Sequence, residues 1–467
     1  MIGRSVRARP DAAGSAEVRA TGPIRSGRAA AGVRQAGPLA LAGLAANGAN
    51  VLVTVIVARL LSVRGYGSLN ELVSVFLVLS MPGSALLVAV VRRVSAWEAS
   101  GDRDRVGPWA SRIRRTGAVA AAALVLAGWL VRGQVADLLS LPSSSGVPEV
   151  LAAGAVWGLL CVDRGLLQSR RSYRRLARNL LVEGGARTLL TLGMVGLGWG
   201  VAGAVGGLVG GVGVALVDAR LGVGRTGRRR GAVAPEEEAL GVPVVAQVAA
   251  LAAPTDAPVA SSHPRLGAEV AVALAALALL AFLQSCDVLV LGHLAPGNVG
   301  PYAAISVASK ALVFAALVLA GFLLPEAATR WRRGDHALHE LGVALAVLLV
   351  PAGALLAFSI AAPRLVLSIA FGSKLTAAAP AFAPLAAAMG LLGSTALFTH
   401  YLLGVGHRRV VLLLGLAAVA SVFVIGSAGG SPAATAWRDL AVQAALAAAA
   451  AVMVVSIHSD VYRRPVA

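Results

Sequence analysis

The sequence has few charged residues for its length. Of its 467 residues, 13% are charged and 57% are hydrophobic, whereas a soluble protein carries about 25% charged residues. Apolar runs of about 20 residues recur along the chain, and a helix needs that length to cross a bilayer. The composition therefore excludes a soluble globular protein and indicates an all-α integral membrane protein with many spans.

Cysteine and lysine are nearly absent. The two cysteines, Cys161 and Cys286, lie in separate apolar runs, so neither a disulfide framework nor a thiol motif is indicated. The only lysines are Lys310 and Lys374, and neither follows a glycine. A Walker-type ATPase needs Gly-Lys-Ser or Gly-Lys-Thr and is excluded on this chain. No Ser-His-Asp or paired-carboxylate pattern stands out, so we expect no enzyme and no bound cofactor.

Acidic residues are scarce beside basic ones, 22 against 41, and the net charge is +19. Such a charge can indicate nucleic-acid binding, but here the basic residues follow the expected membrane topology. We expect about twelve spans, near residues 37–58, 69–91, 116–132, 148–167, 180–198, 201–218, 269–292, 302–323, 338–361, 379–403, 410–426 and 435–457.

The basic residues gather on one side of these spans. With the N-terminus inside, 32 Arg and Lys residues fall on the inner side, and five fall outside: Arg59, Arg64, Arg132, Arg364 and Lys374. Cytoplasmic loops of membrane proteins carry this excess. We therefore expect a multi-pass protein of the plasma membrane with both termini in the cytoplasm and no nucleic-acid partner.

Two segments interrupt the hydrophobic pattern. Residues 1–35 are rich in Arg, Ala and Gly, and we expect a disordered basic cytoplasmic tail or an over-long gene start. Residues 220–268 contain proline, charge clusters and small polar residues, as a cytoplasmic linker does. The linker separates an N-terminal six-helix lobe, 36–219, from a C-terminal six-helix lobe, 269–458, which is followed by a short tail, 459–467.

The two halves carry a similar motif after their first span. The motifs are ARLLSVRGYGSLNELVSVFLVL and LGHLAPGNVGPYAAISVASKALVF. In each, an expected outer loop ends in a glycine, Gly67 or Gly300, before a long apolar helix, and the two glycines are 233 residues apart. Parallel repeats are common in secondary transporters. We therefore expect two six-helix lobes related by a pseudo-two-fold repeat.

Glycines are dense in the hairpin of the fifth and sixth spans, GLGWGVAGAVGGLVGGVGVALVD. At helical spacing they allow two helix backbones to approach closely. We expect tight packing of this hairpin and no nucleotide loop.

One carboxylate lies inside the apolar run LLAFLQSCDVLVLGHL. A charge in lipid costs several kcal/mol unless it is paired, protonated or turned toward water. Asp287 lies about six residues from the outer end of its span and Lys310 about nine residues into the next, so their depths differ by about 4–5 Å. Two interpretations stay open. The two residues form a structural salt bridge, or they line a cavity where protonation of Asp287 is coupled to opening.

Further candidates for a cavity lie in the N-terminal lobe. Glu183 and Arg187 are four residues apart near the inner start of the fifth span, and this spacing predicts an ion pair on one helix face. In the alternative, Arg187 faces a cavity and holds an anionic headgroup. The first span contributes two amides, Asn47 and Asn50, and no carboxylate.

Two other charged pairs suggest membrane-surface positions. Asp163 and Arg164 lie near the inner end of the fourth span, where long side chains can snorkel to the interface. Arg438 and Asp439 follow Trp437 near the outer start of the last span, and we expect an interface anchor there.

The segment DHALHE, Asp335 to Glu340, places His336 and His339 one helical turn apart. No third ligand lies nearby, so we expect no metal site. Asp335 is placed to cap the following helix instead.

Three segments carry a family resemblance: ARLLSVRGYG, SCDVLVLGHLAPGNVGPYAAISVASKALVF and FGSKLTAAAPAFAPLAAAMGLLGSTALFTHYLLGVGHRR. They resemble the bacterial polysaccharide biosynthesis family, the O-antigen and teichoic-acid type flippases of the multidrug/oligosaccharidyl-lipid/polysaccharide exporter superfamily. The resemblance spans roughly residues 36–457. Asp287 falls where that family often has an aspartate, Gly300 and Tyr302 match its G-x-Y motif, and Gly372 matches its FG motif.

The resemblance implies a flippase. Such a protein moves a lipid-linked oligosaccharide or polysaccharide precursor across the plasma membrane by alternating access. The implied partners are a polyprenyl-diphosphate-linked glycan, the lipid bilayer, and glycan polymerases or glycosyltransferases.

Three alternatives stay open. A drug exporter of the same superfamily would share the fold, although proton-driven members resembling that branch usually carry a carboxylate in the first span, where this chain has only Asn47 and Asn50. A major-facilitator transporter would share the six-plus-six topology, but SGDRDRVGPW matches its loop signature poorly. A non-transporting membrane scaffold for glycan assembly is the third.

Overall fold

The computed structural model describes residues 48–170, 172–228, 264–332 and 338–462, and helices make up most of this part of the chain. Two short 3₁₀ segments, Arg103–Arg105 and Ser373–Ala381, adjoin α3 and α13. The helices are Gly48–Leu60, α2 (Val63–Ala99), α3 (Val106–Leu130), α4 (Arg132–Leu138), α5 (Val147–Ser169), α6 (Tyr173–Gly196), α7 (Gly200–Arg228), α9 (Pro264–Leu294), α10 (Val299–Arg332), α11 (Leu338–Ala361), α12 (Pro363–Phe371), α13 (Phe382–Gly404), α14 (Val410–Gly426) and α15 (Pro432–Tyr462).

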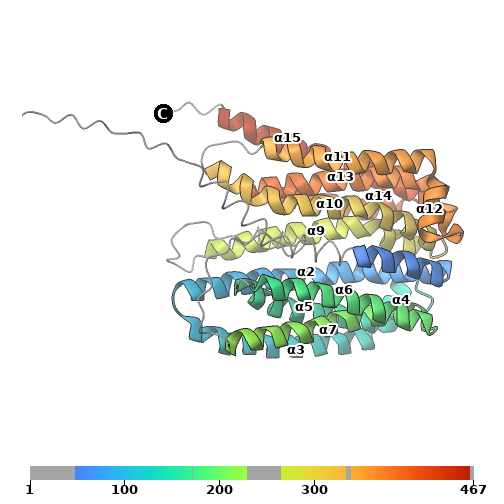
Figure 1. Cartoon of the computed structure of the whole chain (residues 1–467). Helices are drawn as coiled ribbons and strands as arrows, with labels where there is room; N and C mark the ends of the chain where they lie inside the picture. Colours follow the sequence, from blue (N-terminus) through green and yellow to red (C-terminus); the bar gives the residue numbers. More distant parts are fainter. Residues whose placement is uncertain (1–47, 171, 229–263, 333–337, 463–467) are drawn as a thin grey trace, which may run out of the picture.

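The long helices run side by side in two groups (Figure 1). The N-terminal lobe, 48–228, packs α5 against α2, α3 and α7, and the C-terminal lobe, 264–462, packs α13 against α10, α11 and α15. The lobes meet where α2 lies against α9 and α10. The fold-class prediction of an all-α membrane protein with two six-helix lobes is confirmed.

The bundle has two distinct ends. At the arginine-rich end, on the left in Figure 1, α2, α5 and α7 finish and α9 begins. At the other end, which we call the Gly67 end, α2 begins, α9 finishes and α12 lies across the bundle. The two short helices α4 and α12 were not expected from the sequence.

Eleven of the expected spans correspond to described helices, and the first, 37–58, is described only from residue 48 on. The helix at the fifth expected span, α6, is not among the candidate membrane spans. Within the described residues, nine helices are long and apolar enough to cross a membrane, and Gly48–Leu60 and α14 are shorter apolar helices. Helical structure reaches into both ends of the expected linker, because α7 continues to Arg228 and α9 begins at Pro264. Residues 1–47 and 229–263 lie outside the described residues.

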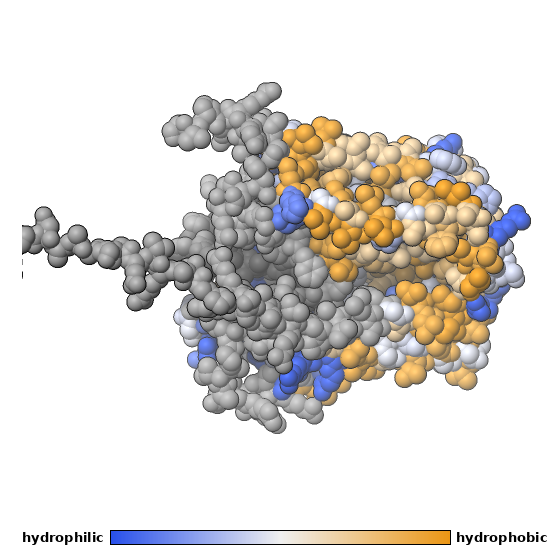
Figure 2. Space-filling model, turned by 45° about the horizontal axis from the view of Figure 1, so that its top comes forward, coloured by the Kyte–Doolittle hydropathy of each residue, from blue (hydrophilic) through white to orange (hydrophobic). Residues whose placement is uncertain are grey.

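Large apolar side chains cover the outside of the bundle. Val350, Leu416 and Phe423 are each more than 70% exposed, and hydrophobic residues dominate much of the visible surface in Figure 2. A soluble protein rarely exposes apolar patches of this extent. The surface is therefore one that faces lipid, and the chain is a multi-pass membrane protein.

Glycines hold α6 and α7 together at short range. A Cβ atom placed on Gly211 would lie 2.5 Å from Cβ of Arg187, and one placed on Gly207 would collide with Thr191. These two glycines are one helical turn apart on the face of α7 that meets α6. The two helices therefore approach closely at these glycines, as the sequence predicts.

The two motif glycines touch each other across the lobes. A Cβ atom on Gly67 would lie 2.8 Å from the backbone nitrogen of Gly300, and a Cβ atom on Gly300 would collide with the carbonyl group of Val63. The first turns of α2 and α10 can approach this closely only because both positions lack a side chain.

Candidate functional site

Three charged side chains from three helices lie together inside the C-terminal lobe. Asp287 on α9 and Asp439 on α15 are fully buried, and Lys310 on α10 is only 7% exposed. Lys310 attracts both carboxylates, and the two carboxylates repel each other. We call these three residues the acid–lysine cluster.

Neutral polar groups surround the cluster. Nε2 of Gln443 donates a hydrogen bond of 3.0 Å to Oδ1 of Asp439, one helical turn away on α15. The Ser306 hydroxyl donates a long hydrogen bond of 3.5 Å to Oδ2 of Asp287. The Tyr302 hydroxyl lies beside the Asp287 carboxyl without forming a hydrogen bond of normal geometry. The motif tyrosine is thus placed in the first turn of α10, facing the last turns of α9.

The protein does not satisfy every polar atom of the cluster. Oδ1 of Asp287, Oδ2 of Asp439 and the Tyr302 hydroxyl have no hydrogen-bond partner in the described part of the chain. Two ionised carboxylates and one ammonium group carry a net charge of −1, and an uncompensated charge is costly to bury. Uptake of one proton would remove that charge. The cluster therefore has the chemistry of a buried proton-binding site.

Of the two interpretations of Asp287 and Lys310, the direct salt bridge is not found. Neither residue takes part in the ion pairs of 4.0 Å or less that join Arg105, Arg114, Arg164, Arg178 and Arg220 to carboxylates in the described part of the chain. The two charges share one buried environment without a direct contact, and Ser306 and Tyr302 lie beside the carboxylate.

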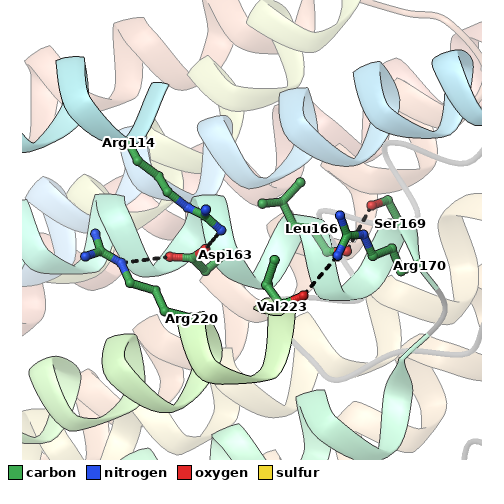
Figure 3. Close-up of polar contacts among 7 residues, drawn as sticks. All are labelled: Arg114, Asp163, Leu166, Ser169, Arg170, Arg220 and Val223. Carbon is green, nitrogen blue, oxygen red and sulfur yellow. Dashed lines mark hydrogen bonds and ion pairs between the residues drawn. The ribbon is translucent and has the colours of Figure 1, made fainter. Parts of the chain in front are cut away.

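A second charged network lies in the N-terminal lobe toward the arginine-rich end. Asp163 on α5 accepts hydrogen bonds from Arg114 on α3 and, at 3.4 Å, from Arg220 on α7 (Figure 3). One buried carboxylate thus joins three helices. In the same view Arg170, just after α5, donates to the carbonyl of Val223 on α7 at 3.2 Å.

Arg164, the neighbour of Asp163 on α5, adds polar contacts to α6. Its Nη2 donates to Glu183 at 2.6 Å and its Nε to Asn179 at 2.8 Å, and its guanidinium group lies 5.5 Å from the centre of the Trp157 ring. The expected ion pair between Glu183 and Arg187 is wrong, because α5 packs against α6 and places Arg164 on the carboxylate first. Arg187 is half-buried and attracts Glu183 only through space.

Two expectations of membrane-surface positions are also wrong. Asp163 and Arg164 do not snorkel, since both side chains are buried among helices. Asp439 is not part of an interface anchor, because the helical turn that exposes Trp437 turns Asp439 inward to the acid–lysine cluster. The two networks differ in one respect: Asp163 and Glu183 in the N-terminal network are held by arginines, whereas the carboxylates of the acid–lysine cluster keep free oxygen atoms.

The remaining predicted residues lie away from both networks. Asn50 is exposed on the first described helix, where its carbonyl accepts a hydrogen bond from Thr54. Asn47 and His336 lie outside the described residues. His339 is exposed at the start of α11, and no group of three metal-binding side chains occurs among the described residues.

Sequence reasoning missed one buried acid at the contact between the lobes. Glu71 on α2 is 3% exposed, and a Cβ atom on Gly292 of α9 would collide with its carboxyl group. Its Oε2 has no hydrogen-bond partner among the described residues. The signal was present, because Glu71 lies within an expected span as Asp287 does.

Comparison with known proteins finds no matching family model and no matching curated protein. Among solved structures, the chain is similar to an inward-facing multidrug resistance MATE family transporter of the MOP superfamily, with 12% identity, a TM-score of 0.65, and 90% of this chain and 99% of that chain covered. It is similar to the lipid II flippase MurJ in an inward closed conformation, with 8% identity, a TM-score of 0.64 and coverage of 88% and 87%. A MOP superfamily transporter from Pyrococcus furiosus matches with 13% identity, a TM-score of 0.55 and coverage of 93% and 96%. At these identities the likeness shows the fold, and the chain has the two-lobed helical fold of these transporters.

Proposed function

We propose that this protein is a transporter that moves a lipid-linked oligosaccharide or polysaccharide precursor across the membrane by alternating access. Its fold is shared with MATE exporters and with the flippase MurJ. The observation that carries a transport role is the acid–lysine cluster, because a membrane protein with a purely structural polar core has no need of buried carboxylates with free oxygen atoms.

The cluster couples proton binding to movement of the lobes. With the cluster unprotonated, the net negative charge favours an arrangement in which Asp287 and Asp439 are hydrated or closer to Lys310. Protonation removes that preference. The three residues come from α9, α10 and α15, and two of these helices, α9 and α10, also contact α2 of the N-terminal lobe. A change at the cluster therefore acts on the contact between the lobes.

The cargo assignment depends on the motifs that the chain shares with polysaccharide flippases. The described first helix, Gly48–Leu60, contains no carboxylate, which favours the flippase over a proton-driven drug exporter. The structural similarity to a MATE transporter and to MurJ favours a transporter of their fold. It lends no support to a major-facilitator transporter or to a scaffold that does not move its ligand.

The arginine-rich end faces the cytoplasm in this proposal. Exposed arginines of α3 and α6, such as Arg112, Arg115 and Arg174, lie at that end. They suit the anionic headgroups of the inner leaflet and the diphosphate of a lipid-linked glycan arriving there.

Depletion of the protein in its native cell tests the proposal. We expect lipid-linked glycan to accumulate on the cytoplasmic side, measured in spheroplasts by resistance of the lipid-linked sugar to an added glycosidase, with loss of surface polysaccharide. An Asp287→Asn variant at normal abundance should not restore export. Unchanged glycan in both pools, together with increased sensitivity to cationic drugs, would instead identify a drug exporter.

A further inference from the structure

The two lobes exchange hydrogen bonds at the Gly67 end of the bundle. The last turn of every helix leaves carbonyl groups without a partner inside that helix, and the partial negative charge there attracts cations. At this end, donor groups from each lobe bind such carbonyls in the other lobe.

The first exchange joins the helix Gly48–Leu60 to α12. The guanidinium group of Arg59 donates to the carbonyl of Ile369, in the last turn of α12. In return, Nζ of Lys374 donates to the carbonyl of Arg59 at 2.9 Å and to the carbonyl of Leu61. Tyr66 and Phe371 pack beside this exchange, with ring centres 6.4 Å apart.

The second exchange joins α4 to α9. The ring of His293 lies with Nδ1 2.8 Å from the carbonyl of Leu138, the last residue of α4. The hydroxyl of Ser140 donates a long hydrogen bond of 3.4 Å to the carbonyl of His293, in the last turn of α9. The two exchanges thus follow the same rule, although they use different residues and different helices.

We propose that Arg59, Lys374, Ser140 and His293 form a latch that holds the Gly67 end closed and that breaks when this end opens. The latch goes beyond the proposed function because it names the contacts that hold one conformational state. It rests on that function in one respect, since a transporter must open this end of the bundle.

Exposure makes the latch easy to break. Arg59, Lys374 and His293 are exposed, so water replaces each partner when the lobes separate, and each exposed contact contributes little. The buried carboxylate networks inside the N-terminal lobe have no such replacement and stay intact. The polar contacts at this end are therefore less costly to break than the buried polar contacts within the N-terminal lobe.

Distance measurements between the lobes test the latch. Spin labels at Ser143→Cys and Ser427→Cys report on the Gly67 end, since both serines are exposed there on different lobes. Labels at Ser111→Cys and Ser456→Cys report on the arginine-rich end. The native cysteines, Cys161 and Cys286, are buried and do not compete for label. Purified full-length protein in nanodiscs is measured by pulsed electron spin resonance.

We expect Arg59→Ala with Lys374→Ala to raise the ratio of long to short distances at the Gly67 end by roughly fivefold to tenfold, with shorter distances at the arginine-rich end. Arg59→Lys with Lys374→Arg keeps a cationic hydrogen-bond donor at each position, and its distance distributions should equal those of the protein without these substitutions. Arg364→Ala is the matched control, because Arg364 is an exposed arginine of α12 itself.

The proposal is overturned if the alanine pair elutes as folded protein and its distances at the Gly67 end equal those of Arg364→Ala. If the alanine pair fails to fold, His293→Ala with Ser140→Ala tests the second exchange, and unchanged distances there overturn the proposal as well. The experiment measures distances between the lobes and not transport. If these distances increase in the alanine pair but the protein moves no glycan, the latch is supported and the proposed function is refuted.

Discussion

Gly67 and Gly300, which are 233 residues apart and occupy matching places in the two halves of the sequence, lie against each other where the lobes meet. The repeat therefore brings its own motif into contact with itself. A contact between matching residues is what a pseudo-two-fold repeat would place on its axis.

A methyl group at this contact should destabilise the closed arrangement. Gly300→Ala puts a Cβ atom into the carbonyl of Val63, and overpacking of this kind costs about 1–3 kcal/mol. Gly297→Ala is the control, because a Cβ atom there meets nothing within 4 Å. Fluorescence-detected size-exclusion chromatography after heating should show a lower melting temperature for Gly300→Ala only, and equal melting of the two variants would refute the contact.

The acid–lysine cluster should tolerate loss of an acid better than loss of its lysine. Lys310→Met leaves two buried carboxylates without a cation, at a cost of several kcal/mol, and should reduce membrane abundance and export. Asp287→Asn should fold tolerably, because an amide still forms hydrogen bonds, but should not export.

The double variant separates the two effects. Lys310→Met with Asp287→Asn should recover abundance without recovering export, as measured by quantitative immunoblot and by surface polysaccharide. Asp137→Asn, at an exposed acid of α4, is the control. Normal abundance and export in all three cluster variants would leave Asp287 with neither role.

A double-mutant cycle should identify Arg164 as the partner of Glu183. Arg164→Met leaves a buried carboxylate unpaired, for which about 3–5 kcal/mol is typical, and Glu183→Gln should restore part of that loss. Arg187→Met should cost much less, because no ion pair joins it to Glu183 among the described contacts. If thermal-stability measurements gave Glu183 a larger coupling free energy with Arg187 than with Arg164, the contact described between α5 and α6 would be contradicted.

The orientation in the membrane follows from accessibility. Cysteines at Ser62 and Ser144, at the Gly67 end, should react with an impermeant maleimide in intact cells. A cysteine at Ser111, at the arginine-rich end, or at Ser262, outside the described residues, should react only after permeabilisation. Labelling of either inner position in intact cells would reverse the proposed topology.

The helices and the two-lobed fold could be predicted because hydropathy and span length are local properties of the sequence. The eleven expected spans after the first each correspond to a described helix, whereas α4 and α12 are too short to give a hydropathy signal. The partners of charged residues could not be predicted in the same way. Helical spacing offers Arg187 to Glu183, but packing between helices supplies Arg164 instead.

The site shows the same limit. The sequence singled out Asp287 and Lys310 because they interrupt apolar runs, and both are buried in one cluster. Asp439 lies 152 residues further along the chain than Asp287 and joins them from α15. Its position beside Trp437 suggested an interface anchor instead. Proximity between distant helices is a property of the folded lobe, and a single sequence does not encode it in any readable spacing.

Movement of a lipid-linked glycan across a bilayer that contains only this protein is the most direct test. Purified protein is reconstituted into liposomes with a fluorescent polyprenyl-diphosphate oligosaccharide, and an added impermeant glycosidase reports the fraction of sugar on the outer leaflet. We predict that nearly all of the glycan becomes accessible over time with the original protein, and that only the initial outer fraction is accessible with Asp287→Asn or with empty liposomes. Equal accessibility in all three would contradict the proposal that this protein is a flippase.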